Sequence, residues 1–396
     1  MAWTLSARDC LPEDGAAGTL IGRAWIPADG AKPAGPSVVV VGSDGVFDIT
    51  AAAPTISMLC NADDPVALVR TAPRDRRLGS IEEIVANSAA DARNPTRAWL
   101  LAPIDLQAVK AAGVTFALSM LERVIEEHAK GDPRGAPAAR ATLTAEIGAD
   151  LARIRPGSPE AERLKQVLIQ RGLWSQYLEV GIGPYAEVFT KCPPMASVGL
   201  GAEIGLHPDS TWNNPEPEIV MVVDSRGCAI GATLGNDVNL RDFEGRSALL
   251  LGKAKDNNAS SAIGPFIRLF DQSFTLDHVR AAEVDLHIAG TDGFVLDGRS
   301  SMRLISRDVL DLIEHAAGPY HQYPDGFVLF TGTMFAPTKD RGQPGLGFTH
   351  KLGDIVTIKT PGLGALVNRV TLATKAPPWT FGMGALMQNL RARGFL

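Results

Sequence analysis

The sequence predicts an α+β fold that is mainly β. From Gly181 onward the chain is a succession of short apolar segments rich in β-branched residues, separated by glycines and turn residues. This half of the chain lacks the alternation of strands with long helices that marks βαβ units. A closed or folded-over β body is therefore expected over the second half of the chain.

The first hundred residues are expected to form a smaller β-rich domain. The segments TLIGRAWIP (19–27) and PSVVVV (36–41) have the composition of strands, and a Ser43-Asp44-Gly45 turn leads into VFDIT (46–50). Two strands joined by such a turn are typical of a β-hairpin. We place the domain boundary at residue 104, with a small N-terminal domain over 1–104 and a larger domain over 105–396.

Helical spacing appears in three places between residues 105 and 171. Apolar side chains recur at helical intervals from Asp105 to Lys130, with Gly113 as an interruption. Two further helices are expected over 138–154 and 159–171. Ser158 would cap the second of these, and Pro159 would occupy its first position.

Six segments of the second half predict the strands of the β body. They are EIVMVV (218–223), GCAIGATLG (227–235), AEVDLHIAG (282–290), GFVLF (326–330), DIVTIKT (354–360) and ALVNRVTLA (365–373).

Composition excludes several classes of function. The net charge of −6 gives no support for binding to nucleic acid or to an anionic membrane. The first fifteen residues lack the apolar core of a signal peptide, and no stretch approaches the roughly 18 apolar residues of a membrane span. A soluble, cytoplasmic protein is therefore expected. The four cysteines form no C-x-x-C pair and the histidines no H-E-x-x-H or H-x-H, so a metal site would be built from oxygen.

Three carboxylates are expected to converge around the strand pair 218–234. Glu216 and Glu218 are two residues apart at the start of an apolar strand, so both side chains point to one face. If the chain returns as a hairpin centred on the DSRG turn, Gly235 lies opposite Glu216. Asp237, two residues further on, then emerges beside the glutamates.

Converging carboxylates require a cation or raised pKa values. Oxygen ligands suit a hard ion, Mg²⁺ first, with Mn²⁺ or Ca²⁺ as alternatives. A helical turn after Asp237 would bring Arg241 and Glu244 to the same face, and Lys255 follows shortly. Taken singly, an E-x-E at a strand edge is more often a solvated edge, and N-D-x-x-x-R-D a capped helix start. The informative feature is the combination in this order.

This combination resembles the core of the fumarylacetoacetate hydrolase superfamily. The order is E-x-E, then N-D-x-x-x-R-D, then a lysine, then G-P. Flanking matches are AEVFTKCPPMASVG (186–199), GFVLFTGTMFAPTKD (326–340) and KLGDIVTIKTPGLGALVNRV (351–370). The resemblance spans about residues 102–372. It implies a mixed β-sandwich roll as the catalytic domain, and a homodimer or homotetramer.

The resemblance also implies roles for individual residues. Glu216, Glu218 and Asp237 would be the metal ligands. Lys255 would lie beside the carboxylate or enolate oxygen of a small 2-oxo acid, and Thr333 would hydrogen-bond its carboxylate. Arg241 and Glu244 are candidates for substrate contact, with a structural ion pair as the alternative.

The segment GVTFALSMLE (113–122) departs from part of the family. Hydrolytic and decarboxylating relatives carry G-x-N-Y-x-x-H-x-x-E on a lid, whereas this chain has Ser119 in place of the histidine and Glu122 in place of the glutamate. Serine alone is no general base near neutral pH. The 2-keto-3-deoxy sugar-acid dehydratases, with a serine-bearing lid and an acidic residue at the position of Glu187, are the more similar branch.

The resulting hypothesis is a Mg²⁺-dependent dehydratase. Glu187 would remove a C3 proton from a 2-keto-3-deoxy pentonate, and Glu122 would protonate the departing C4 hydroxyl, giving 2-oxoglutarate semialdehyde. Two alternatives stay open. One is a C–C bond hydrolase of acylpyruvates or diketo sugar acids, with Glu122 and Ser119 activating water. The other is a non-catalytic sugar-acid-binding protein on the same scaffold.

Overall fold

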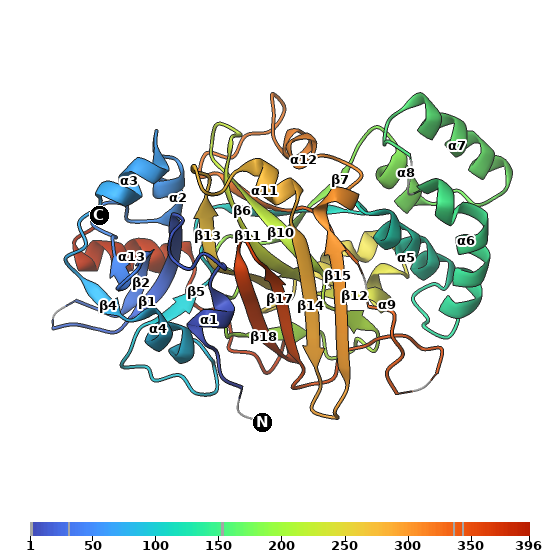
Figure 1. Cartoon of the computed structure of the whole chain (residues 1–396). Coiled ribbons are helices and arrows are strands. Elements are labelled where there is room, and N and C mark those ends of the chain that lie inside the picture. The colour runs from blue at the N-terminus through green and yellow to red at the C-terminus, as the bar shows by residue number, and fades with distance from the viewer. Residues whose placement is uncertain (1–2, 31, 152–153, 336, 343) are drawn as a thin grey trace.

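The fold is built on two β-sheets packed face to face, with helices at both ends (Figure 1). It is described from a computed structural model that covers residues 3–30, 32–151, 154–335, 337–342 and 344–396. The side chains of residues 145–151 are not among those described. The mainly β, α+β architecture expected from the sequence is confirmed.

The larger sheet has eleven strands, which come from both the N-terminal part and the remainder of the chain. Its neighbours are antiparallel except for the parallel pair β16–β6, and β5 (Trp99–Leu101) pairs with β1 beside the main order. In spatial order the strands are β4 (Arg77–Gly79), β3 (Gly45–Asp48), β2 (Gly35–Gly42), β1 (Leu20–Ile26), β13 (Ser261–Leu269), β11 (Ala229–Asp237), β10 (Pro217–Val223), β16 (Phe327–Phe330), β6 (Ala108–Gly113) and β7 (Glu187–Cys192).

The smaller sheet covers one face of the larger one. Its strands, in spatial order, are β15 (Val295–Ser301), β14 (Glu283–Ala289), β17 (Ile355–Thr360), β18 (Gly364–Leu372) and β8 (Glu203–Leu206). A separate two-stranded ladder joins β9 (Asn213–Asn214) and β12 (Asn239–Leu240) next to the carboxylates discussed below. All six strands expected in the second half and the N-terminal hairpin at Ser43–Gly45 are therefore confirmed.

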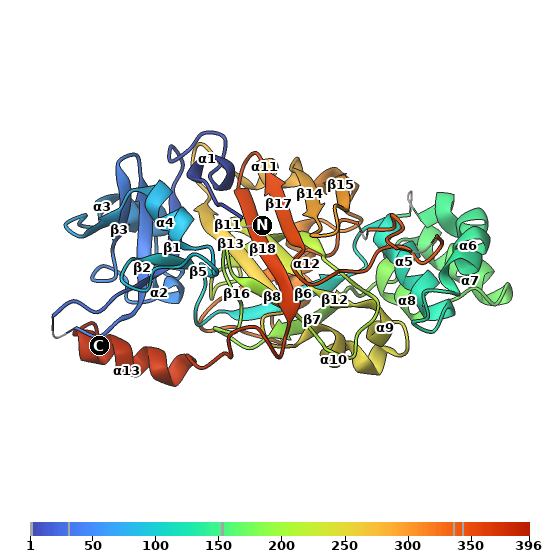
Figure 2. The same cartoon turned by 90° about the horizontal axis from the view of Figure 1, so that it is seen from below.

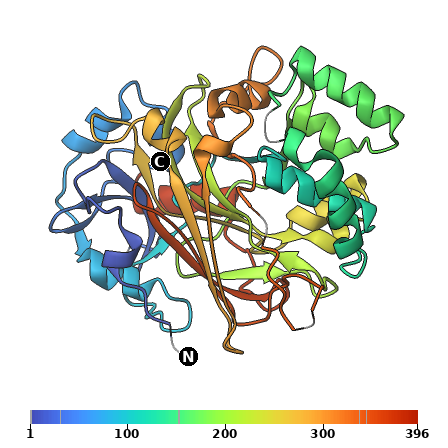
Figure 3. The same cartoon turned by 45° about the vertical axis from the view of Figure 1, so that its right-hand side comes forward.

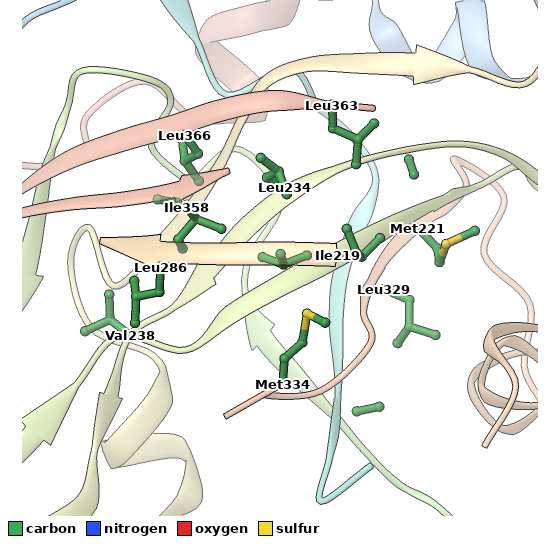
Figure 4. Close-up of a cluster of buried hydrophobic side chains, with 14 of the residues drawn as sticks. Ile219, Met221, Leu234, Val238, Leu286, Leu329, Met334, Ile358, Leu363 and Leu366 are labelled. Atoms are coloured by element: carbon green, nitrogen blue, oxygen red, sulfur yellow. The ribbon is translucent and has the colours of Figure 1, made fainter. Parts of the chain in front are cut away.

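The main core lies between the two sheets. Ile219 and Leu234 from the larger sheet meet Leu286, Ile358 and Leu366 from the smaller one, and each is at most 1% exposed (Figure 4). Burying side chains of this size contributes about 1.5–3 kcal/mol each. Alternate residues of β10 belong to this core and to a second core on the opposite face of the sheet. The strand that carries Glu218 is thus fixed from both sides.

The helices fall into groups along the chain. Those of the N-terminal part are α1 (Ala7–Cys10), α2 (Ile56–Cys60), α3 (Pro65–Thr71) and α4 (Ile81–Asn87). A helical insertion on one side of the sheets consists of α5 (Ala117–His128), α6 (Ala136–Leu151), α7 (Pro159–Gln170) and α8 (Gln176–Ile182) (Figure 3). Short helices follow as α9 (Arg241–Glu244), α10 (Leu251–Lys255), α11 (Leu276–Arg280) and α12 (Val309–Ala316).

The prediction for residues 105–130 is only half correct. The segment begins as strand β6 and becomes helical only from Ala117, because β6 is held on one edge by β16 and on the other by β7. The two later helices are confirmed as α6 and α7, with Ser158 capping α7 through the amide of Ala161. The predicted stretch 152–153 lies outside the described residues.

Strands from residues 1–104 and from the remainder of the chain share the larger sheet, since β1 pairs with both β2 and β13. The C-terminal helix α13 (Met383–Arg393) returns to the N-terminal part (Figure 2), where Arg393 donates to the Pro36 carbonyl at 2.7 Å. The domain boundary at residue 104 stays a prediction.

Among the described residues, no helix is both long enough and apolar enough to cross a membrane.

Candidate metal and active site

Three buried carboxylates meet where β10 begins and β11 ends. Glu216, Glu218 and Asp237 are each 1% exposed, and each offers a carboxylate oxygen within 4.8 Å of the others. Glu216 and Glu218 point to one face because they are two residues apart in an extended segment. The convergence expected from the sequence is therefore present.

The register of the hairpin differs from the expected one. Glu218, not Glu216, lies opposite Gly235, because the turn is longer than assumed and a β-bulge follows between Val222 and Val223. The difference amounts to two residues. Since side chains alternate with a period of two, Asp237 stays on the face of the glutamates. Its amide also donates to the Glu216 carbonyl at 3.1 Å.

The charges of the three carboxylates are not equally balanced. Burial, and then the charges of Asp237 and Glu216, raise the pKa of Glu218 well above its usual range. Burial also acts to raise the pKa of Glu216, but the charges of Lys255 and Arg123 outweigh it and lower this pKa to about 2. A group of like charges held this close, with one member driven toward protonation, is the electrostatic setting that a cation relieves.

Lys255 contacts two of the three carboxylates. Its Nζ is 2.5 Å from Glu216 Oε2 and 3.1 Å from Asp237 Oδ2. Burial acts to lower the pKa of Lys255, but the carboxylates of Asp237 and Glu216 outweigh it and raise the pKa above its usual range. The amine is therefore a permanent cation in this position, as a role beside a substrate oxygen requires.

The end of β16 supports Glu218 from the other side. The Gly332 amide donates to Glu218 Oε2 at 2.7 Å, and Thr333 Oγ1 donates to Oε1 at 3.4 Å. Thr333 also lines the cavity described next. It was expected to hydrogen-bond a substrate carboxylate, and that role stays a prediction.

A small enclosed cavity adjoins the carboxylates. About 10 Å³ of it is open to water-sized molecules, roughly the room that one water needs. A 2-oxo sugar acid therefore requires side chains to move before it binds. The cavity is lined by Ala112, Gly113, Val114, Ser119, Arg123, Glu187, Phe189, Glu216, Asp237, Glu244, Lys255 and Thr333.

Glu187 has the properties of a base at this cavity. It begins β7 opposite Gly113, and a methyl group on Gly113 would lie 1.9 Å from Glu187 Oε2. The absence of a side chain at position 113 thus makes room for the carboxyl group. Burial, followed by the charge of Glu244, raises the pKa of Glu187 to about 7. At neutral pH this group can both accept and return a proton.

Besides Glu187, Glu244 is the carboxylate of the cavity wall that does not belong to the acidic triad. Arg123 Nη1 lies 3.3 Å from its Oε2. Burial nevertheless raises its pKa, the charge of Arg123 acting in the opposite direction. The structure therefore places Glu244 at the cavity, as expected from the sequence, but on α9 rather than on a helix shared with Asp237.

Glu122 lies away from the cavity wall. Its carboxylate accepts hydrogen bonds from Arg140 at 2.7 Å and from Arg241 at 2.9 Å. Burial acts to raise its pKa, but the two arginines outweigh this and lower it. A carboxylate held in this way is a poor proton donor, contrary to the role expected for Glu122. Arg241 also makes structural contacts here. Its Nε donates to Glu126 Oε1 at 2.6 Å, and its guanidinium lies 4.4 Å from the centre of the Trp212 ring.

Ser119 is buried and lines the cavity, but its hydroxyl donates to the Phe116 carbonyl at 2.9 Å. The hydroxyl is therefore engaged within the first turn of α5. It has no side-chain base next to it among the hydrogen bonds of the described residues.

Two cations of the site were missed in the sequence. Arg123, on α5, bridges Glu216, Glu126 and Glu244. Lys191, at the end of β7, is fully buried with its Nζ 2.7 Å from Asp237 Oδ1. Arg123 follows Ser119 by four residues, a helical spacing that places both on one face. That spacing was the only available signal, and it becomes informative only when the partner of α5 is known.

The residues fit a divalent metal ion. The donors are all oxygen, and the triad is closed to solvent. Among the charged side chains lining the cavity, the four carboxylates of Glu187, Glu216, Asp237 and Glu244 face only the two cations Arg123 and Lys255. One divalent cation would balance this excess. Mg²⁺ is the hard, oxygen-preferring ion that suits such a set, with Mn²⁺ and Ca²⁺ chemically close.

A comparison with known protein families identifies the class of protein to which this fold and this acidic triad point. Residues 183–371, slightly under half of the chain, match the family model described as fumarylacetoacetate (FAA) hydrolase C-terminal. The chain therefore carries a domain of the fumarylacetoacetate hydrolase family, as its motifs predicted.

Two curated relatives are similar to part of this chain. The chain is 31% identical over 184 residues to the 2-dehydro-3-deoxy-D-arabinonate dehydratase of Saccharolobus solfataricus, covering 46% of this chain and 58% of the relative. It is 31% identical over 195 residues to a probable 2-keto-3-deoxyxylonate dehydratase of Haloferax volcanii, covering 49% and 63%. The matches thus span less than two thirds of these relatives.

Solved structures share the fold over most of the chain. The apo form of 2-keto-3-deoxy-D-arabinonate dehydratase superposes with a TM-score of 0.58 at 20% identity, covering 89% of this chain and 99% of its own. A 2-keto-3-deoxy-D-arabinonate dehydratase complexed with magnesium and 2,5-dioxopentanoate superposes with a TM-score of 0.56, also at 20% identity and with the same coverage.

Proposed function

We propose that this protein is a divalent-metal-dependent dehydratase of a 2-keto-3-deoxy pentonate, producing 2-oxoglutarate semialdehyde. The observation that carries the proposal is the closeness of Glu216, Glu218 and Asp237, two of which, Glu216 and Asp237, line one cavity together with Lys255 and Glu187. The names of the two curated relatives support the substrate class and the reaction.

Glu216, Glu218 and Asp237 would hold the metal ion, Mg²⁺ in the first place. When bound, the ion would supply positive charge next to the carboxylate and keto oxygens of the substrate and so favour enolisation. Lys255 adds a second cation at the same place. Thr333 and the guanidinium of Arg123 are the cavity groups that can bind the substrate carboxylate.

Glu187 would remove the proton from C3. The electron pair of that C–H bond then moves toward the keto group, where Lys255 stabilises the negative charge. A pKa of about 7 suits this task, because an ionised fraction is available at neutral pH while the conjugate acid can still give the proton back.

Loss of the C4 hydroxyl needs an acid, and Glu244 replaces Glu122 in that role. Both are carboxyl groups, but only Glu244 lines the cavity, and its pKa is raised while that of Glu122 is lowered. Glu244 is ionised in the free protein, and its raised pKa favours uptake of a proton once the substrate is bound. It would give that proton to the C4 oxygen as the C–O bond breaks, so that water leaves and Glu244 returns to its ionised form. Tautomerisation of the remaining C3–C5 unit then gives the terminal aldehyde.

The placement of Ser119 and Glu122 supports dehydration over hydrolysis. A C–C hydrolase needs a base to activate water, and the two lid residues considered for it are held by the Phe116 carbonyl and by two arginines. The soluble, cytoplasmic, homodimeric or homotetrameric state expected from the sequence belongs to the same proposal.

Product identification tests the proposed function. The Mg²⁺-loaded protein is incubated with 2-keto-3-deoxy-arabinonate, 2-keto-3-deoxy-xylonate, a six-carbon homologue and an acylpyruvate, and the products are identified by NMR. We expect a five-carbon semialdehyde from a pentonate and no pyruvate. Pyruvate with a shorter fragment would favour the hydrolase, and no turnover of any 2-oxo acid would favour the binding protein.

A further inference from the structure

Strand β7 carries a fully buried lysine for which the proposed mechanism has no role. Lys191 is 0% exposed and lies four residues after Glu187, the proposed base. The pairing of β7 with β6 is interrupted at this point. Thr190 lies opposite Lys110 and Cys192 lies opposite Val109, which leaves Lys191 as the extra residue of a β-bulge. A bulge re-aims a side chain relative to the regular ladder.

The re-aimed amine meets three oxygen atoms. Lys191 Nζ donates to the Val238 carbonyl at 3.2 Å and to the Lys255 carbonyl, and it lies 2.7 Å from Asp237 Oδ1. The contacts with the two carbonyls are hydrogen bonds, and the contact with Asp237 Oδ1 is an ion pair. Asp237 ends β11, Val238 follows it and Lys255 ends α10, so all three acceptors lie at the ends of the two elements that supply Asp237 and Lys255 to the cavity.

The two oxygens of Asp237 are thereby given different partners. Oδ1 faces Lys191, while Oδ2 lies 3.1 Å from Lys255 Nζ on the cavity side. Burying an ammonium group in a protein is costly unless it is paired and fully hydrogen-bonded. The buried ammonium group of Lys191 is paired with Asp237 and hydrogen-bonded to two carbonyls. Strand β7, which carries Lys191, also carries Glu187, the proposed base. Lys191 therefore links the strand of the proposed base to Asp237 and to Lys255.

We propose that Lys191 is a positioning residue that orients Asp237 for metal binding, by engaging Oδ1 and leaving Oδ2 as the oxygen that faces the ion. The inference rests on the proposed function, because it requires that Asp237 be a metal ligand. The Lys191 amine also fixes Lys255, through its hydrogen bond to the Lys255 carbonyl at the end of α10. Partners of ligating carboxylates typically change metal affinity about 10- to 100-fold when removed.

Two opposing effects follow from removing the charge. The loss of a nearby cation lowers repulsion of a metal ion, whereas Asp237 becomes free to rotate within the buried site. The second effect is larger, because Asp237 stands between Lys191 and Lys255 and its rotation removes a ligand outright. Lys191→Met should therefore weaken Mn²⁺ binding about 10- to 100-fold.

The experiment measures the Mn²⁺ dissociation constant by EPR of the free ion in the full-length chain, with circular dichroism and thermal unfolding as checks of the fold. Lys191→Gln is the second variant, because its amide can still donate to the backbone carbonyls but carries no charge. Lys110→Met is the matched control. Lys110 Nζ, on β6, donates to Oγ1 of Thr190 at 2.9 Å, and Thr190 directly precedes Lys191 on β7. Lys110 does not line the cavity. The Lys110→Met variant should bind Mn²⁺ within about twofold of wild type.

The outcomes separate this inference from the proposed function. Weakened binding in folded Lys191→Met, or in Lys191→Gln where the methionine variant does not fold, with Lys110→Met unchanged, supports the inference. Wild-type affinity in a folded Lys191 variant overturns it and leaves the proposed metal site intact. Absence of Mn²⁺ binding by the wild-type protein would overturn the metal site and the inference together.

Discussion

The charge of Glu244 should control the pH at which Glu187 works as a base. Burial is the largest cause of the raised pKa of Glu187, and the negative charge of Glu244 is the second. Glu244→Gln removes that charge while keeping the shape of the side chain. The pKa of Glu187 should therefore fall toward the ordinary value of a glutamate, about 4.3.

The magnitude follows from the value of about 7 for the wild-type protein. A base acts in its ionised form, so activity is present above this pKa and is lost as the pH falls through it. With a pKa of about 7, the ionised fraction rises from about one eleventh at pH 6 to about ten elevenths at pH 8, a change of roughly tenfold. In Glu244→Gln the same rise should occur at lower pH, and the ratio between pH 8 and pH 6 should shrink.

The assay isolates the proton transfer from the loss of water. Exchange of the C3 protons with deuterated solvent is followed by NMR, using a 2-oxo acid that lacks the C4 hydroxyl, at the same metal saturation for both proteins. Glu203→Gln is a suitable control, because Glu203 pairs with Arg369 on the smaller sheet and does not line the cavity. An unshifted profile in Glu244→Gln, or a wild-type profile already flat between pH 6 and pH 8, would show that Glu244 does not set the pKa of Glu187.

Four further outcomes are expected. Dialysis against a chelator should abolish turnover and Mn²⁺ should restore it, and the variants Glu216→Gln, Glu218→Gln and Asp237→Asn should each bind Mn²⁺ more weakly in EPR titrations. Glu187→Gln should lower kcat far more than it raises KM. Gly113→Ala should lower C3 exchange but leave Mn²⁺ affinity unchanged, because the added methyl would lie 1.9 Å from Glu187 Oε2. Arg241→Met should cost about 3–5 kcal/mol of stability in urea unfolding, since it leaves the buried Glu126 without one of its partners; a loss below about 1 kcal/mol would contradict that account.

The β body could be predicted because its strands are marked by local composition. The strand over Pro217–Val223 is buried on both faces and reads as a continuous apolar run. Strand β6 could not be predicted in the same way. Its sequence, AVKAAG, is weak in β-branched residues, and it is extended because β16 and β7 pair with it from distant parts of the chain.

The convergence of the acidic triad was predictable because Glu216 and Glu218 lie two residues apart in one extended segment. The details of the register were not, since neither the bulge after Val222 nor the length of the turn has a clear mark in the sequence. The expected convergence holds because the register differs by an even number of residues. A difference of one would have turned Asp237 to the other face.

The surrounding cations could not be predicted, because their partners are distant in sequence. Arg123 meets Glu216 across 93 residues, and Lys191 meets Lys255 across 64. Glu122 shows the converse difficulty. A motif fixes its place in the sequence, but the packing of α5 turns Ser119 and Arg123 to the cavity and leaves Glu122 to Arg140 and Arg241.

In the proposed site, three carboxylates hold one metal ion beside the proposed base and Lys255. Crystals grown with Mn²⁺ and a non-reactive 2-oxo acid test it directly through the anomalous signal of the metal. One anomalous peak is expected about 2.0–2.6 Å from oxygens of Glu216, Glu218 and Asp237, with the keto oxygen of the ligand facing it and Glu187 near C3. A peak elsewhere, or a 2-oxo acid bound at the cavity with no metal at the triad, would contradict it.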